Sequence, residues 1–160
     1  MKEYEYSYNV TNLKPYIEYC EKNAYEKVEE TKQIRIIYRK EDKTMARITI
    51  KTKNGIKVKE LDFKQDLLNG NDLIERKESM ALKFEDEEAV ISMLDFLNYK
   101  KDNTLDRKRI VYEKGNVKFE FDDYVEPRKA YVVAFEGNPQ EVDEVYLELK
   151  ELNEKYKTNE

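Results

Sequence analysis

Charged side chains recur at every second position in several strand-like segments of this 160-residue chain. Arg47, Lys51 and Lys53 share one face of one such segment, and Glu3 and Glu5 share one face of another. Because alternate residues of a strand point to the same side, each segment has a charged face and an apolar face. Cationic faces bind phosphate oxygens and carboxylates bind hard divalent cations. Brought together, such faces indicate a site for a metal-chelated polyphosphate.

Composition excludes several other kinds of chemistry. Histidine is absent and Cys20 is the only cysteine, so Ser-His-Asp and Cys-His catalysis, disulfides and cysteine-rich zinc sites are ruled out. A net charge of −5 argues against binding of a nucleic-acid duplex by a basic face. The apolar runs are short and the first residues do not resemble a signal peptide. We therefore expect a cytoplasmic protein with no membrane partner.

The elements that must position these charges are mostly strands. The pair Asn54-Gly55 is a strong hairpin signal. Asn138 and Pro139 mark the start of the last helix, with Glu141 placed for a capping box. We expect one domain over residues 1–152 and a frayed tail over 153–160. The expected strands span about 3–10, 33–39, 44–53, 56–63, 74–84, 105–112, 117–124 and 130–136, with helices at about 13–23, from Asp86 and from Pro139.

Two architectures fit this pattern within an α+β fold. In one, an open antiparallel sheet packs its apolar face on the helices and leaves its charged face in water. In the other, eight antiparallel strands close into a tunnel or barrel with the charges inside and about three helices packed outside. Unpaired buried charge is costly, so a charged interior is expected to hold water and a ligand. A polyphosphate with Mg²⁺ or Mn²⁺ would satisfy both signs of charge.

Short motifs follow one another along residues 3 to 150. Glu3-Tyr4-Glu5-Tyr6-Ser7 resembles an ExExK signature, and Ile34-Arg35-Ile36 resembles an RxR strand. The rest are a lysine strand at 48–51, an arginine-glutamate strand at 76–78, a KxR strand at 107–112, a strand ending in an acid at 117–122 and a closing ExE at 133–136. In this order they resemble the CYTH superfamily of triphosphate tunnel metalloenzymes. That family includes class IV adenylate cyclases, thiamine triphosphatases and inorganic triphosphatases.

The resemblance implies a role for each matching residue. The implied catalytic residues are Glu3, Glu5 and Lys51. The implied phosphate-binding residues are Arg35, Arg39, Lys51, Arg76, Arg107, Arg109 and Lys118. The implied ligands of Mg²⁺ or Mn²⁺ are Glu3, Glu5, Glu78, Glu120, Asp122 and Glu136.

Three positions depart from the family pattern. Ser7 replaces a lysine, Ile37 replaces the second arginine of RxR, and Ala134 replaces the first glutamate of the closing ExE. The interpretation we favour is a metal-dependent phosphohydrolase of inorganic tripolyphosphate or of a nucleoside or thiamine triphosphate. A class IV-type adenylate cyclase and a degenerate, non-catalytic polyphosphate- or nucleotide-binding module remain as alternatives. The expected partner is a triphosphate-containing small molecule, and the sequence leaves monomer and homodimer both open.

Overall fold

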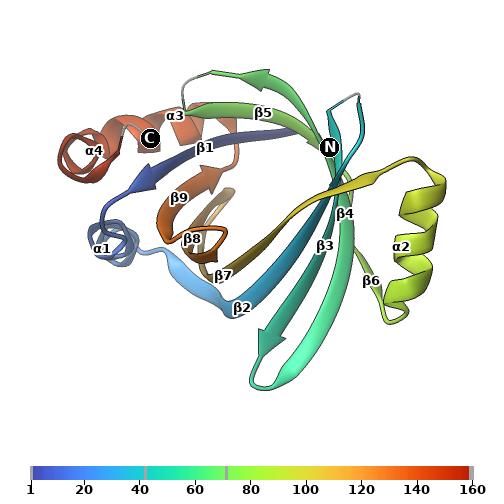
Figure 1. The fold of residues 1–160 in the computed structure, drawn as a ribbon. Coiled ribbons are helices and arrows are strands. Elements are labelled where there is room, and N and C mark those ends of the chain that lie inside the picture. Colours follow the sequence, from blue (N-terminus) through green and yellow to red (C-terminus); the bar gives the residue numbers. More distant parts are fainter. Residues whose placement is uncertain (1, 42, 71, 159–160) are drawn as a thin grey trace.

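The strands form a closed antiparallel barrel in the computed structural model, which describes residues 2–41, 43–70 and 72–158. Going round the sheet, the strands follow the order β3-β2-β7-β8-β9-β1-β5-β4, and pairing of β4 with β3 closes the ring (Figure 1). The ninth strand, β6, pairs with β4 outside the ring. The strands are β1 (Lys2–Val10), β2 (Glu26–Arg39), β3 (Thr44–Lys53), β4 (Ile56–Asn69), β5 (Leu73–Glu78), β6 (Leu82–Phe84), β7 (Lys100–Lys114), β8 (Val117–Glu126) and β9 (Ala130–Glu136).

Short turns set the register of the long hairpins. Asn54 and Gly55 both have positive φ, as the two-residue turn between β3 and β4 requires. Gly115 has a φ of 57° in the turn between β7 and β8. In the ladder between β2 and β3, Arg35 pairs with Thr49. Directly paired residues lie on the same face of the sheet, so every such hairpin brings polar side chains of two strands together.

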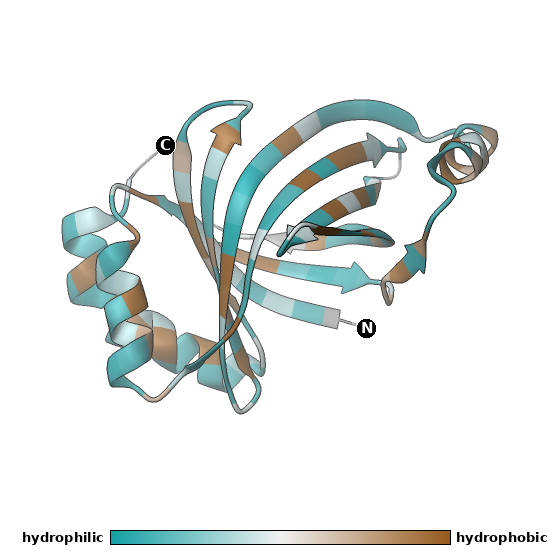
Figure 2. Cartoon of the chain, turned by 90° about the horizontal axis from the view of Figure 1, so that it is seen from below, coloured by the Kyte–Doolittle hydropathy of each residue, from teal (hydrophilic) through white to brown (hydrophobic). Residues whose placement is uncertain are grey.

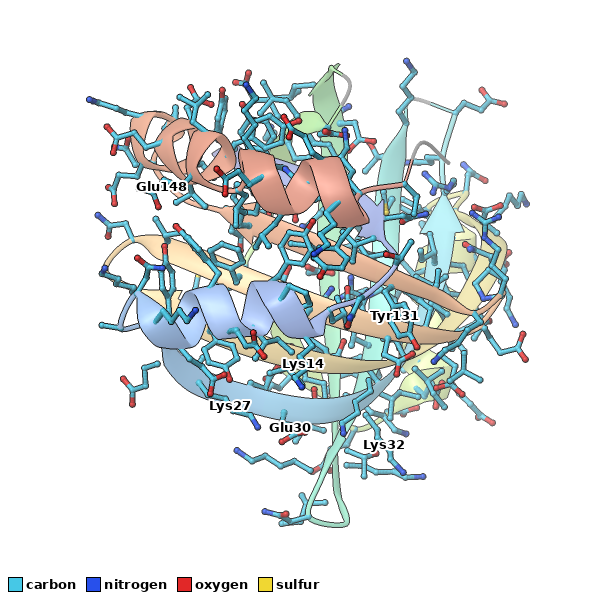
Figure 3. The ribbon with its side chains drawn as sticks, turned by 90° about the vertical axis from the view of Figure 1, so that its left-hand side faces the viewer. Lys14, Lys27, Glu30, Lys32, Tyr131 and Glu148 are labelled. Carbon is cyan, nitrogen blue, oxygen red and sulfur yellow. The ribbon has the colours of Figure 1, made fainter. Side chains whose placement is uncertain are left out.

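Helices cover two separate parts of the outer surface. Helices α1 (Lys14–Lys22), α3 (Pro139–Glu148) and α4 (Lys150–Tyr156) lie on one side of the barrel, and α2 (Glu87–Phe96) lies on the opposite side (Figure 1). Asp86 and Asn138 cap α2 and α3, each accepting a hydrogen bond from a backbone N–H of the first turn. Exterior charges such as Lys14, Lys27, Glu30 and Lys32 are exposed to solvent on the side seen in Figure 3.

The hydrophobic core lies between the helices and the outer faces of the strands. One cluster joins α1, α3 and α4 to β1, β8 and β9 and includes Tyr16, Phe119, Phe135 and Leu149, all fully buried. A smaller cluster joins α2 to β2 and β3 around Ile48 and Leu94. Figure 2 shows hydrophilic and hydrophobic residues alternating along the strands. The apolar faces therefore point outward under the helices, and the charged faces point into the barrel.

The closed, charge-lined barrel confirms the second architecture and excludes the open sheet. Several details differ from the sequence prediction. The stretch 74–84 forms two short strands, and β2, β4 and β7 are longer than expected. Leu13 occupies the N-cap position of α1 without a side-chain cap, and Asn12 Oδ1 accepts a hydrogen bond from the backbone N–H of Lys14 at 3.0 Å. A fourth helix, α4, occupies residues expected to fray, because the hydroxyl of Tyr16 donates a hydrogen bond to Asn153 Oδ1 at 2.8 Å and Lys157 bridges to Val10. Within the described residues, none of the helices has the length and hydrophobicity needed to cross a bilayer.

Candidate functional site

A cavity of about 370 Å³ lies inside the barrel, and most of its lining residues are charged. All of the residues that the sequence resemblance implicated line this cavity: Glu3, Glu5, Arg35, Arg39, Lys51, Arg76, Glu78, Arg107, Arg109, Lys118, Glu120, Asp122 and Glu136. They come from seven of the eight barrel strands, so only closure of the ring brings them together. The eighth strand, β4, adds further charges that are described below.

Three carboxylates meet on one wall. Glu5 pairs with Glu136 across the β1–β9 ladder, and Glu3 lies two residues from Glu5 on the same face. One oxygen from each of the three lies within 4.8 Å of the others. Glu3 and Glu5 are buried. Clustered carboxylate oxygens are the ligands that Mg²⁺ and Mn²⁺ prefer, and of the six predicted metal ligands these three are the ones that the structure gathers into such a group.

The three carboxyl groups of this cluster titrate differently. Burial and the charge of Glu3 raise the pKa of Glu5 to about 7. Burial and a hydrogen bond with Glu3 raise the pKa of Glu136 to about 9. Burial alone would raise the pKa of Glu3 too, but its hydrogen bond with Glu136 and the charge of Lys64 outweigh burial and lower it to about 2. Three carboxylates this close repel one another, so protons or a divalent cation must share the site. The cluster therefore fits a divalent cation.

On β7 and β8, cations and acids form a tight network. The guanidinium of Arg109 donates to Asp122 at 2.7 and 2.8 Å and to Glu120 at 2.7 Å. Arg107 donates to Gln33 and to the hydroxyl of Tyr124. Burial opposes ionisation of Glu120, but the charge of Arg109 is stronger and lowers its pKa. Asp122 and Glu120 are thus paired with arginine, and neither belongs to the group of three clustered carboxylates.

Lys118 links the network of β8 to the carboxylate cluster. Its ammonium group lies 3.1 Å from Glu136 and 3.8 Å from Glu120. Burial lowers the pKa of Lys118, but the negative charges of Glu120 and Glu136 outweigh burial and raise it above the ordinary value. Lys118 therefore stays protonated beside the cluster at neutral pH.

Arg35 is the cation whose surroundings differ most from those of the others. Its Nε donates to Thr49 Oγ1 at 2.9 Å. In the part of the chain that the structure describes, no carboxylate lies within ion-pair distance of Arg35. Burial and the charges of Arg47, Arg107 and Arg109 lower its pKa. A half-buried guanidinium among three others is poised to receive an anion.

The remaining predicted cations are each paired with carboxylates. Arg76 contacts Glu5 at 3.3 Å and Asp66 at 2.9 Å. Lys51 lies 3.6 Å from both Glu29 and Glu60. Arg39 pairs with Asp102 at 2.7 Å, and both side chains are about half exposed. Arg39 therefore lies at the rim and contributes less to the interior than Arg35.

The structure adds lining residues that sequence reasoning left out. Arg47 binds Asp62 through two guanidinium nitrogens. Lys64 is buried and contacts Glu3 at 2.8 Å and Glu78 at 3.2 Å. The alternation of Arg47 with Thr49 and Lys51 along one strand could have identified Arg47 as a lining residue. Lys64 was missed because the expected strand ended at Phe63, whereas β4 continues to Asn69.

The three departures from the family pattern all line the cavity. Ser7 and Ala134 are direct partners in the β1–β9 ladder, so two of them form one uncharged patch. Ile37 is the ladder partner of Arg47. The cation absent at position 37 is therefore replaced by one that enters the tunnel from the neighbouring strand.

Several solved structures share this fold. The PH1012 protein from Pyrococcus horikoshii OT3 superimposes with a TM-score of 0.74 at 17% identity, covering 92% of this chain and 87% of that one. HpAC1 from Hippeastrum, a candidate adenylyl cyclase with a dominant triphosphatase activity, superimposes with a TM-score of 0.67 at 13% identity. The match covers 99% of this chain and 91% of HpAC1. The triphosphatase of the mimivirus capping enzyme superimposes with a TM-score of 0.56 at 12% identity. The match covers 92% of this chain and 88% of the triphosphatase. No protein-family model matches the chain, and no curated protein sequence does.

The class that these features define is a closed antiparallel β-barrel with a charged interior cavity. The chain shares its fold with HpAC1 and with the mimivirus capping-enzyme triphosphatase, in keeping with the resemblance that its ordered motifs suggest. Identities below 20% establish the shared architecture and leave the activity to be argued from this chain's own residues.

Proposed function

We propose that the tunnel binds the triphosphate group of a small molecule together with Mg²⁺ or Mn²⁺ and hydrolyses its terminal phosphate. The observation that carries the proposal is Arg35, a half-buried guanidinium without a carboxylate partner in the described residues, in the same cavity as a cluster of three carboxylates. Unpaired positive charge and crowded negative charge in one cavity favour a ligand that carries both signs, which a metal-chelated polyphosphate does.

The charge of the lining supports an anionic ligand. Nine lysine and arginine side chains and eight carboxyl groups line the cavity. The net charge of the lining is therefore positive at pH 7, although the whole chain is negative. A positive tunnel in a negative protein concentrates small anions and repels large nucleic acids.

Each group of residues has a role in this proposal. Arg35, Arg107 and Arg109 would hold phosphate oxygens, and the carboxylates of Glu3, Glu5 and Glu136 would hold the cation. A bound Mg²⁺ or Mn²⁺ would neutralise charge that develops on the phosphate oxygens. The carboxylate of Glu5 would orient a water whose oxygen bonds to the terminal phosphorus as the bridging P–O bond breaks. Phosphoryl transfer depends mainly on such positioning and charge.

A panel of substrates tests the proposal. Purified full-length protein is assayed for phosphate release from tripolyphosphate, ATP and thiamine triphosphate with Mg²⁺ and with Mn²⁺. We expect release from at least one substrate, and a loss of at least tenfold in Glu5→Gln. The matched control is Glu126→Gln, which changes an exposed residue in the same way and should keep full activity. No release from any substrate with either metal contradicts the hydrolase.

One observation favours a second candidate, a module that binds triphosphate without turnover. Ser7 and Ala134 leave an uncharged patch next to the carboxylate cluster, and fewer charges there would slow phosphoryl transfer while leaving the fold intact. Calorimetric binding of the same ligands without phosphate release would identify this candidate. Formation of cyclic AMP from ATP would instead identify a cyclase.

A further inference from the structure

Part of the tunnel lining is made by apolar and aromatic side chains. Five barrel strands that follow one another round the sheet contribute large apolar or aromatic side chains to the cavity. We call these five residues the apolar collar: Met45 on β3, Ile37 on β2, Leu105 on β7, Tyr124 on β8 and Val132 on β9.

The ladders show that the collar forms a layer beside a charged layer. Each collar residue is the direct partner of a charged lining residue on the preceding strand of the ring. The pairs are Lys64 with Met45, Arg47 with Ile37, Arg35 with Leu105, Arg107 with Tyr124, and Asp122 with Val132. Barrel strands tilt against the axis, so a stagger repeated in the same sense over five pairings produces two stacked partial rings. One is apolar and the other is charged.

The spacing between the two layers is short. Arg35 and Arg107 lie two residues from Ile37 and Leu105 along their own strands, which corresponds to roughly 7 Å. Tyr124 joins the layers, because its hydroxyl accepts a hydrogen bond from Arg107 at 2.8 Å and its ring lies 5.6 Å from the same guanidinium. A phosphate chain on the arginines would therefore end beside the collar.

The uncharged lining continues past the collar. Ser7 and Ala134 are ladder partners, and Ala134 lies two residues from Val132 on β9. Ile37, a member of the collar, is another of the positions at which this chain departs from the charged family pattern. Ser7 and Ala134 therefore leave one part of the lining uncharged, whereas Arg47 lies beside Ile37 on the neighbouring strand.

We propose that the apolar collar binds the planar organic group of an organic triphosphate, with its phosphate chain on the adjacent arginines. The inference rests on the proposed function and makes it more specific: the ligand is an organic triphosphate, and inorganic tripolyphosphate is a poor substitute. A heteroaromatic group offers apolar faces to the collar, whereas tripolyphosphate offers none. A cavity of about 370 Å³ lies within the range of roughly 300–1,000 Å³ typical of sites for organic ligands.

Binding measurements on the full chain test the collar. Dissociation constants are measured by calorimetry for ATP, thiamine triphosphate and tripolyphosphate, each with Mg²⁺. We expect at least one organic ligand to bind tenfold or more tightly than tripolyphosphate. Val132→Thr and Leu105→Asn keep the side-chain size but place a polar group in the collar. Each should reduce the preference for the organic ligand by about 5- to 50-fold, the range expected from changes in apolar pocket contacts.

Matched controls make the same changes on the exterior. Val125 and Leu147 are exposed, so Val125→Thr and Leu147→Asn should leave the preference unchanged. Val132→Thr is nearly isosteric, which keeps the test usable if Leu105→Asn does not fold. Tripolyphosphate binding as tightly as both organic ligands, or a preference that neither collar variant reduces, overturns the collar inference while leaving triphosphate binding intact. Failure of all three ligands to bind overturns the proposed function and the collar together.

Discussion

Replacing Arg35 should stabilise the ligand-free protein and weaken ligand binding, and these opposite effects follow from its surroundings. Its Nε donates to Thr49, but within the described chain its guanidinium lacks a carboxylate partner. Arg47, Arg107 and Arg109 add like charge around it. Arg35→Gln removes this charge and keeps a hydrogen-bond donor for Thr49. The variant therefore relieves repulsion in the empty tunnel and removes attraction for an anion.

General values for charge repulsion and for charge-assisted hydrogen bonds bound the change in unfolding free energy and the loss of affinity expected for Arg35→Gln. Two like charges about 8 Å apart repel by about 2 kcal/mol at an effective dielectric constant of 20. The carboxylates beside the neighbouring arginines and the partial exposure of Arg35 reduce the total, so we expect a gain in unfolding free energy of about 1–2 kcal/mol. For a chain of this size each kcal/mol raises Tm by about 2–4 °C. Charge-assisted hydrogen bonds contribute about 1.5–3 kcal/mol, so binding should weaken by about 10- to 150-fold.

Two measurements check the Arg35→Gln prediction. Thermal denaturation in phosphate-free buffer should show a Tm increase of about 2–8 °C, and calorimetry with Mg²⁺ and tripolyphosphate or ATP should show the loss of affinity. Arg128→Gln makes the same change at an exposed position and should alter neither quantity. A lower Tm together with unchanged affinity would refute the reasoning, because Arg35 would then be a structural residue whose charge is already compensated.

Two further predictions concern the carboxylate cluster. Ligand-free protein should lose stability as pH rises from about 5 to 9, since Glu5 and Glu136, with pKa values raised to about 7 and 9, retain protons in the folded state that the unfolded chain releases near 4.5. Thermal denaturation across this range checks the slope, which Glu136→Gln should reduce; a flat profile contradicts it. Lys64→Met should destabilise the protein by about 3–5 kcal/mol, because it leaves the buried carboxylate of Glu3 without its cation at 2.8 Å. Urea unfolding measures this loss, and a change below about 1 kcal/mol would show that Glu3 does not depend on Lys64.

Local features of the fold could be predicted from the sequence because short-range rules govern them. The Asn54-Gly55 turn, the Asp86 and Asn138 caps and the faces of the strands follow from residues only a few positions apart. Strand ends were less predictable. The register of β4 beyond Phe63 depends on pairing with β5, and Lys64 was missed for that reason.

The geometry of the site depends on contacts distant in sequence. Glu3 and Lys64 are 61 positions apart, and Arg107 and Gln33 are 74 apart. No local pattern states that these side chains meet, because pairing of β2 with β7 brings Arg107 to Gln33, and pairing of β5 with both β1 and β4 brings Glu3 to Lys64. The raised pKa of Glu5 and the exposed pair of Arg39 at the rim likewise follow from position in the barrel and not from residue type.

The alternation of charged and apolar residues by itself determined that the strands would have two unlike faces, and the absence of histidine limited the chemistry to carboxylates and cations. The same alternation suits an open sheet with its charges in water. Tertiary structure decided between the two, because closing the ring turns the charges inward and leaves the apolar faces for the helices. Closure is a property of all eight strands at once, since shear and tilt must agree round the whole barrel.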